Sequence, residues 1–180
     1  MHKFVALLRA VNVGGNAKAP SAALKAAAEG IGLRAVQTVL QTGNLVFEAD
    51  GKPEALEQRL EQAFQDELGL ETEVMVRSAA EWSAIVAANP FPDEAAGDPG
   101  RLLVMVMKRE PLAEGVRALQ AHPGPERIEA RGRELYVVYP EGIGRSKLNG
   151  AAGWKKLGCQ GTGRNWNTVV KLAALLAAAR

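Results

Sequence analysis

The chain has 180 residues, of which 47% are hydrophobic and 23% are charged, a composition typical of one ordinary domain or two small ones. The longest apolar runs are far shorter than the roughly 20 residues of a membrane helix, and Arg9 interrupts the apolar start of the chain, so we expect neither a membrane span nor a signal peptide. A single cysteine and two histidines exclude an internal disulfide and a histidine-rich metal site, and they fit a cytoplasmic protein.

The charge is unevenly distributed although the formal net charge is only +2. The last 39 residues, 142–180, contain seven Lys or Arg and no Asp or Glu, and residues 1–47 are also basic. The acidic residues are concentrated in the middle of the chain. This asymmetry favours an anionic partner. The alternative is that the basic ends pack beside the acidic middle.

The first half of the chain alternates between strand and helix patterns. We predict strands at 4–13, 36–41, 45–48 and 72–77, helices at 20–29 and 53–68, and a hairpin turn at 42–44. The resulting order, β-α-β-β-α-β, is typical of a ferredoxin-like unit with an antiparallel sheet.

The second half repeats most of this order. Ser78 and Glu81 predict a capping box at the start of a helix over 78–88, and the prolines of 89–100 predict a loop. Further predicted elements are a strand at 102–107, a helix at 111–121, strands at 127–131 and 134–139 around Gly132, and a helix at 168–180. This half resembles a second ferredoxin-like unit without its last strand. We therefore expect an α+β fold of two ferredoxin-like units, residues 1–77 and 78–180.

Four polar segments are candidates for a binding site. Residues 12–16 and 142–147 are glycine-rich turns that offer backbone N–H groups to an anion, and the second turn also carries a hydroxyl and two cations. Residues 41–44 supply amide side chains, and residues 162–168 combine a cation, amides and a tryptophan before the last helix. Each segment also has a purely structural interpretation as a turn, a hairpin or a helix cap.

The sequence motifs of several common kinds of catalytic and metal site are absent. The sequence has no phosphate-binding P-loop, no Gly-x-Ser-x-Gly elbow and no cluster with metal-ligand spacing. No motif in it indicates a particular cofactor, so the cofactor is left unknown. Cys159 and His122 are a weak nucleophile–base pair because they are far apart in the sequence. No general base is evident, so whether the chain is an enzyme is left open.

Five segments together resemble the bacterial family called domain of unknown function 1697. They are 5–15, 41–47, 89–91, 139–148 and 162–168, with Ala10 and Thr42 where the family favours glycine and serine. The resemblance implies a pair of ferredoxin-like units and no activity. It implies a binding site made of Asn12, Gly14, Gly15, Gln41, Gly43, Asn44, Arg145, Ser146, Lys147, Arg164, Asn165 and Asn167.

Our leading hypothesis is a cytoplasmic protein that binds a small anion, such as a nucleotide or a phosphorylated metabolite, in one cleft between the motifs near the two ends of the chain. The competing hypothesis is a nucleic-acid-binding module, because Trp154 and Trp166 stand among the cations of the basic tail. A third is a protein-interaction domain, in which acidic and basic segments meet in a homodimer.

Overall fold

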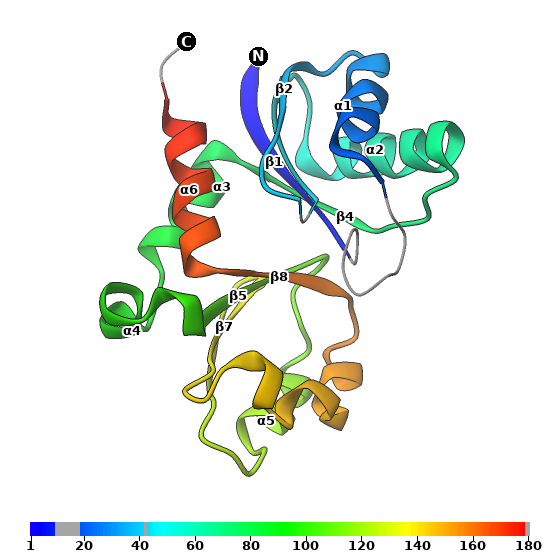
Figure 1. Ribbon diagram of the computed structural model, residues 1–180. Helices are drawn as coiled ribbons and strands as arrows, with labels where there is room; N and C mark the ends of the chain where they lie inside the picture. Colours follow the sequence, from blue (N-terminus) through cyan, green and yellow to red (C-terminus); the bar gives the residue numbers. More distant parts are fainter. Residues whose placement is uncertain (10–18, 42, 179–180) are drawn as a thin grey trace. The chain divides into compact units, whose positions relative to one another are not determined.

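The structure is a computed structural model and describes residues 1–9, 19–41 and 43–178 (Figure 1). The chain forms two compact units, one of residues 1–84 with 172–180 and the other of residues 85–171. Each contains a four-stranded antiparallel sheet with helices, which confirms the predicted α+β fold of two ferredoxin-like units. The predicted boundary after residue 77 stays a prediction.

The sheet of the first unit has the strand order β2-β3-β1-β4. Its strands are β1 (His2–Leu8), β2 (Arg34–Thr38), β3 (Asn44–Ala49) and β4 (Val74–Ser78). All neighbouring strands pair antiparallel, as predicted. The predicted strand 36–41 ends early, at Thr38, because Leu40 adopts a positive φ of 59° in the connection to β3.

Helices α1 (Ser21–Gly30) and α2 (Pro53–Leu68) cover one face of this sheet (Figure 1). Alternate residues of β1, among them Phe4 and Ala6, join the core beneath the helices, as the two-residue period of a strand requires. The ring of Phe4 stacks on that of Phe47 with centroids 5.8 Å apart. Gly69, with a φ of 60°, ends α2 in the left-handed conformation that glycine adopts without strain.

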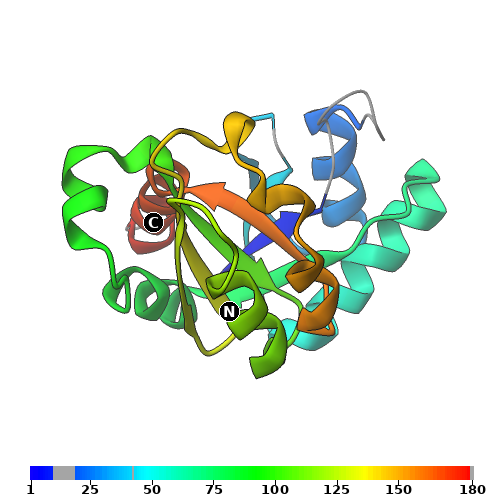
Figure 2. The same cartoon turned by 90° about the horizontal axis from the view of Figure 1, so that it is seen from below.

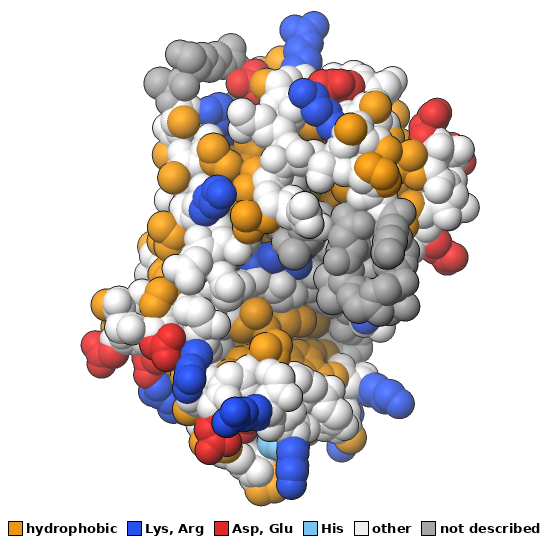
Figure 3. All heavy atoms as spheres, in the orientation of Figure 1, with side chains coloured by type: hydrophobic (Ala, Val, Ile, Leu, Met, Phe, Trp, Pro, Cys, Tyr) orange, Lys and Arg blue, Asp and Glu red, His pale blue; other side chains and the backbone are white. Residues whose placement is uncertain are grey.

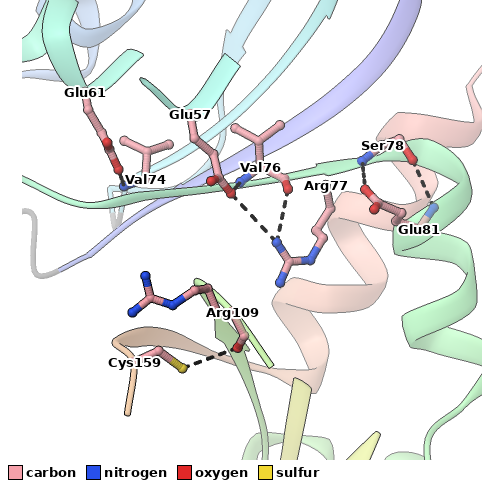
Figure 4. A network of polar contacts seen from close by, with 9 residues as sticks. All are labelled: Glu57, Glu61, Val74, Val76, Arg77, Ser78, Glu81, Arg109 and Cys159. Atoms are coloured by element: carbon pink, nitrogen blue, oxygen red, sulfur yellow. Dashed lines mark hydrogen bonds and ion pairs between the residues drawn. The ribbon is translucent and has the colours of Figure 1, made fainter. Parts of the chain in front are cut away.

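The outer edge of β4 is covered by carboxylates of α2 (Figure 4). The backbone N–H groups of Val74 and Val76 donate to Glu61 and Glu57 respectively, each at 2.9 Å. Glu57 also lies 3.9 Å from the buried guanidinium of Arg77. Helix α2 therefore supplies both the apolar cover of the sheet and the acceptors for its edge strand.

The sheet of the second unit has the same arrangement, β6-β7-β5-β8. Its strands are β5 (Leu102–Met107), β6 (Arg127–Arg131), β7 (Glu134–Val138) and β8 (Gly161–Asn165). Strand β8 corrects the prediction that this unit lacks its last strand and that residues 162–165 form a turn. Gly161 and Gly163 lie opposite Met107 and Met105. A Cβ at either glycine would clash with a methionine sulfur, so the space beside β8 is filled by side chains of β5.

One face of the second sheet is covered by α5 (Ala113–Gln120) and by two short 3-10 helices, η3 (Leu148–Gly150) and η4 (Ala152–Leu157) (Figure 2). A further 3-10 helix, η2 (Ile143–Arg145), precedes them and has no buried residue. These 3-10 turns stand where the first unit has its second long helix. A Cβ at Gly115 would lie 2.5 Å from the backbone of Lys156 and Leu157. Helix α5 thus packs directly against the backbone of η4.

The remaining helices depart from prediction in two places. Residues 89–100 were predicted as a loop, yet they contain α4 (Pro92–Gly97) and begin η1 (Pro99–Arg101). Helix α4 is compatible with its proline because Pro92 occupies the first turn. The final helix, α6 (Trp166–Ala177), begins two residues before the predicted start.

Helix α3 (Ala79–Ala87) has the predicted capping box. The Ser78 N–H donates to Glu81 at 2.8 Å and the Glu81 N–H donates to the Ser78 hydroxyl at 3.1 Å (Figure 4). Across the described ranges, no helix is both long and apolar enough to cross a bilayer.

Candidate functional site

The glycine-rich turn near the N-terminus belongs to the candidate site predicted from the sequence. Asn12, Gly14 and Gly15 lie outside the described residues. The hypothesis that they share one site with the C-terminal motifs stays a prediction.

The loop between β2 and β3 and the first residue of β3 contain three further candidates. Asn44 is 1% exposed, and its side-chain N–H donates to the Val39 carbonyl at 2.9 Å, so its amide closes the loop. Gly43 has a φ of 74° and accepts a hydrogen bond from the Leu8 N–H. The Gln41 side chain is exposed and bonds to no residue in the described part of the chain. Of the three, Gln41 is the side chain available to a ligand.

Residues 142–156, which we name the basic segment, are fixed by bonds between their own side chains and backbone. The Asn149 amide donates to the Ile143 carbonyl at 2.9 Å, and the Trp154 indole N–H donates to the Leu148 carbonyl at 2.7 Å. Leu148 is fully buried in the core beneath α5. These bonds and the buried Leu148 hold the segment in place against the second sheet.

Four cations project from this segment: Arg145, Lys147, Lys155 and Lys156. All four residues are exposed. Within the described ranges, none of their side chains forms an ion pair or a hydrogen bond. Elsewhere, arginines such as Arg101 and Arg131 lie beside carboxylates. The basic segment thus keeps cations whose charge is not offset by a contacting acid.

Ser146 lies between two of these cations and is bonded to a residue that the sequence analysis missed. Its hydroxyl donates to Glu126 Oε1, and its oxygen accepts from the Leu148 N–H at 3.1 Å. The other carboxylate oxygen, Glu126 Oε2, is buried and has no hydrogen-bond partner among the described residues. Glu126 lies 20 residues from Ser146, so no local spacing could have linked the two.

The second basic motif lies on β8 and the start of α6. Arg164 is 8% exposed, and it donates to the Thr162 hydroxyl at 2.7 Å and to the Gly163 carbonyl at 2.8 Å. Burial lowers the pKa of its guanidinium to about 10. Asn165 caps α6 by accepting from the Thr168 N–H at 3.1 Å.

The second sheet brings two of the predicted motifs to one end. Leu102 pairs with Val138 at the end of β7, and the neighbouring Leu103 pairs with Asn165 at the end of β8. The basic segment follows directly from the end of β7, so it starts at the same end of the sheet as Asn165 and the exposed Asn167. Antiparallel register therefore brings the end of β8 and the start of the basic segment to the same end of the second sheet.

Metal and thiol chemistry receive no support from the described residues. The described ranges contain no group of three or more His, Cys, Asp or Glu that could hold a metal ion. The Cys159 thiol donates to the Arg109 carbonyl at 3.3 Å (Figure 4), which is a structural use of the sulfur.

Comparisons with known proteins support the fold. A family model described as "Protein of unknown function (DUF1697)" matches residues 1–136. A solved structure of the conserved bacterial protein SP0830 from Streptococcus pneumoniae matches with a TM-score of 0.76 and 19% sequence identity, over 97% of this chain and 98% of that one. The search of curated proteins gave no match.

Proposed function

Because this chain belongs to the DUF1697 family, whose description names no activity, we propose a function from its own residues: it binds a small anionic ligand at the basic segment. A phosphorylated metabolite or a nucleotide is the class of ligand that fits. Arg145 and Lys147 supply the charge, and the exposed Asn165 and Asn167 of the same unit are candidates for orienting the rest of the ligand.

The observation that carries the proposal is the set of exposed cations on a segment that is already fixed. A cation that is bonded to a carboxylate must lose that bond before it binds a phosphate, whereas Arg145 and Lys147 bond to no acid in the described part of the chain. The side-chain bonds within 142–156 also reduce the entropy lost on binding.

The spacing of the cations bears on the choice between a small ligand and a long polyanion. On the face shown in Figure 3, lysine and arginine side chains stand apart, with uncharged and apolar surface between them. Nucleic-acid-binding surfaces instead gather cations along a patch or stripe that tracks the phosphate backbone.

A thermal-shift titration tests the proposal. Inorganic pyrophosphate, AMP, ATP and glucose 6-phosphate are added separately to the full chain at low salt. A ligand present at about 100 times its Kd stabilises the fold by roughly 2.7 kcal/mol, which raises Tm by about 5–10 °C in a chain of this size. The double variant Arg145→Ala/Lys147→Ala should lose this rise.

The matched control is Lys52→Ala/Arg117→Ala, which removes the same charge from two exposed sites outside the segment. It should keep the full rise in Tm. The proposal fails if none of the four compounds raises the Tm of the wild-type chain, or if both double variants lose the rise equally.

A further inference from the structure

Ser146 and Glu126 have the arrangement of a nucleophile and its base. The Ser146 hydroxyl donates a hydrogen bond to Glu126 Oε1. Glu126 lies directly before β6, 20 positions away in the sequence. The Leu148 N–H bonds to the same hydroxyl oxygen and fixes its position. A hydroxyl oxygen has two lone pairs, so one is left to attack an electrophile. A base in hydrogen-bond contact with an oriented hydroxyl is the geometric signature of an activated serine.

The second oxygen of Glu126 argues against a purely structural role. Glu126 Oε2 is buried and bonds to nothing in the described ranges. It lies close to Gly124, where a Cβ would meet it. A buried oxygen without a hydrogen bond costs free energy, and a loop that needed only an acceptor for Ser146 could use the neutral amide of glutamine. The free-energy cost of the unbonded Glu126 oxygen is explained if this carboxylate accepts a proton during a reaction.

The residues beside Ser146 offer a hydrogen-bond donor to the oxygen of a reacting carbonyl group and positive charge to an anionic group on the substrate. The backbone N–H of Lys147 bonds to no acceptor among the described residues. The N–H that directly follows a nucleophilic serine is a common donor to the oxyanion of an acyl intermediate. The side chains of Arg145 and Lys147 are exposed cations on either side in the sequence, suited to an anionic group on the same substrate.

We propose that Ser146 and Glu126 form a catalytic pair that hydrolyses a carboxylic ester carrying an anionic group. The proposal rests on the proposed anion binding at the basic segment. Ser146 Oγ forms a bond to the ester carbonyl carbon as its proton passes to Glu126. The bond from that carbon to the alcohol oxygen then breaks, and the alcohol leaves with the proton from Glu126. Water attacks the acyl-serine, giving one proton to Glu126, which returns it to Ser146 as the carboxylic acid departs.

Covalent labelling of the wild-type chain tests the pair directly. A fluorophosphonate reacts with activated serines by forming an Oγ–P bond with loss of fluoride. Incubation followed by peptide mass spectrometry should place one adduct on Ser146. Labelling should be absent in Ser146→Ala and at least 100-fold slower in Glu126→Gln, in line with the usual contribution of a general base. Ser83→Ala changes an exposed serine on α3 and should label at the wild-type rate.

Hydrolysis of two chromogenic esters tests the substrate class. p-Nitrophenyl hemisuccinate carries a carboxylate and p-nitrophenyl acetate does not, so the hemisuccinate should have a kcat/KM at least 10-fold higher. Arg145→Ala/Lys147→Ala should remove that preference.

Two results overturn the inference: no adduct on Ser146 in the folded wild-type chain, or labelling of Glu126→Gln at the wild-type rate. The thermal shift with pyrophosphate or a nucleotide is measured separately. A wild-type chain that shows this shift without labelling would retain the proposed anion binding and lose the catalytic pair.

Discussion

Arg77 and Arg164 hold equivalent positions in the two units. Each lies on the last strand of its sheet, opposite a valine of the central strand, Val5 for Arg77 and Val104 for Arg164. Each guanidinium is buried and donates to the carbonyl of the preceding residue, at 3.1 Å for Arg77 and 2.8 Å for Arg164.

The residue after each arginine also has the same role. Ser78 caps α3 and Asn165 caps α6, each by accepting from the N–H three residues later. The same series of a strand, a buried arginine, a cap residue and a helix thus occurs in both units, although the cap residues differ. The repeat is visible in backbone register and in hydrogen bonds, while the sequences of the two halves show no clear similarity.

The buried pair of Glu57 and Arg77 predicts a large loss of stability when the carboxylate is removed. Glu57→Ala leaves the Arg77 guanidinium without its neighbouring charge and the Val76 N–H without its acceptor, so the free energy of unfolding should fall by about 3 kcal/mol. Glu67→Ala, at an exposed position of the same helix, should change it by less than about 0.5 kcal/mol. Urea denaturation measures both, and similar values for the two variants would contradict the prediction.

The capping box of α3 predicts a smaller effect. Ser78→Ala removes the acceptor of the Glu81 N–H and should lower the free energy of unfolding by about 1 kcal/mol. Ser83→Ala, on the exposed side of the same helix, should be neutral or slightly stabilising because alanine favours helix. Equal destabilisation by both substitutions, measured by chemical denaturation, would refute a role for the cap.

Two glycine-to-alanine substitutions should act in opposite directions. Gly115→Ala forces α5 away from the backbone of η4 and should cost about 1–3 kcal/mol. Gly97→Ala, at the end of α4, meets nothing within 4 Å and should stabilise the fold by about 0.4–1 kcal/mol, because alanine restricts the unfolded chain. Thermal unfolding distinguishes the two. A stabilising Gly115→Ala would show that helix and turn are not in close contact.

The two tyrosines predict a loss of stability at alkaline pH. Burial, with a further effect of Glu126, raises the pKa of Tyr139 to about 12, and burial together with Glu134 raises that of Tyr136 further. In the unfolded chain both phenols lose their protons near pH 10. Their contribution to stability is therefore complete below pH 10 and is lost as the pH rises from about 10 to 12 and above.

Spectrophotometric titration checks this directly, since the chain contains two tyrosines in all. The folded protein should show little phenolate absorbance at pH 10.5, whereas the protein in urea should be mostly ionised. Tyr139→Phe should reduce the alkaline loss of stability. A folded-state titration near pH 10 would show that the two phenols are solvated.

Strand β8 shows why part of the fold could not be predicted. Prediction of the other strands relied on runs of large apolar residues between turn signals, and that pattern located the four strands of the first sheet. In β8 the alternate positions are Gly161 and Gly163, and the apolar contacts come from Met105, Met107 and Leu103 on the neighbouring strand. The pattern that marks β8 as a strand therefore lies in β5.

The candidate site shows the same limit. Arg145, Ser146 and Lys147 were accessible to prediction because cations, hydroxyl and glycines are close together in the sequence. Glu126 was not, because its contact with Ser146 depends on where β6 begins and β7 ends. Contacts between residues 20 positions apart need the register of the sheet, which composition and local spacing do not provide.

The carboxylates of Glu57 and Glu61 also bear on aggregation. An exposed strand edge is a template for pairing with another chain, and the acceptors of α2 occupy the N–H groups of Val74 and Val76 that such pairing would use. The same helix covers the core of the first sheet, so detachment of α2 exposes an apolar face and a pairing edge together. We therefore expect partly folded molecules that lack a docked α2 to associate more readily than the native protein.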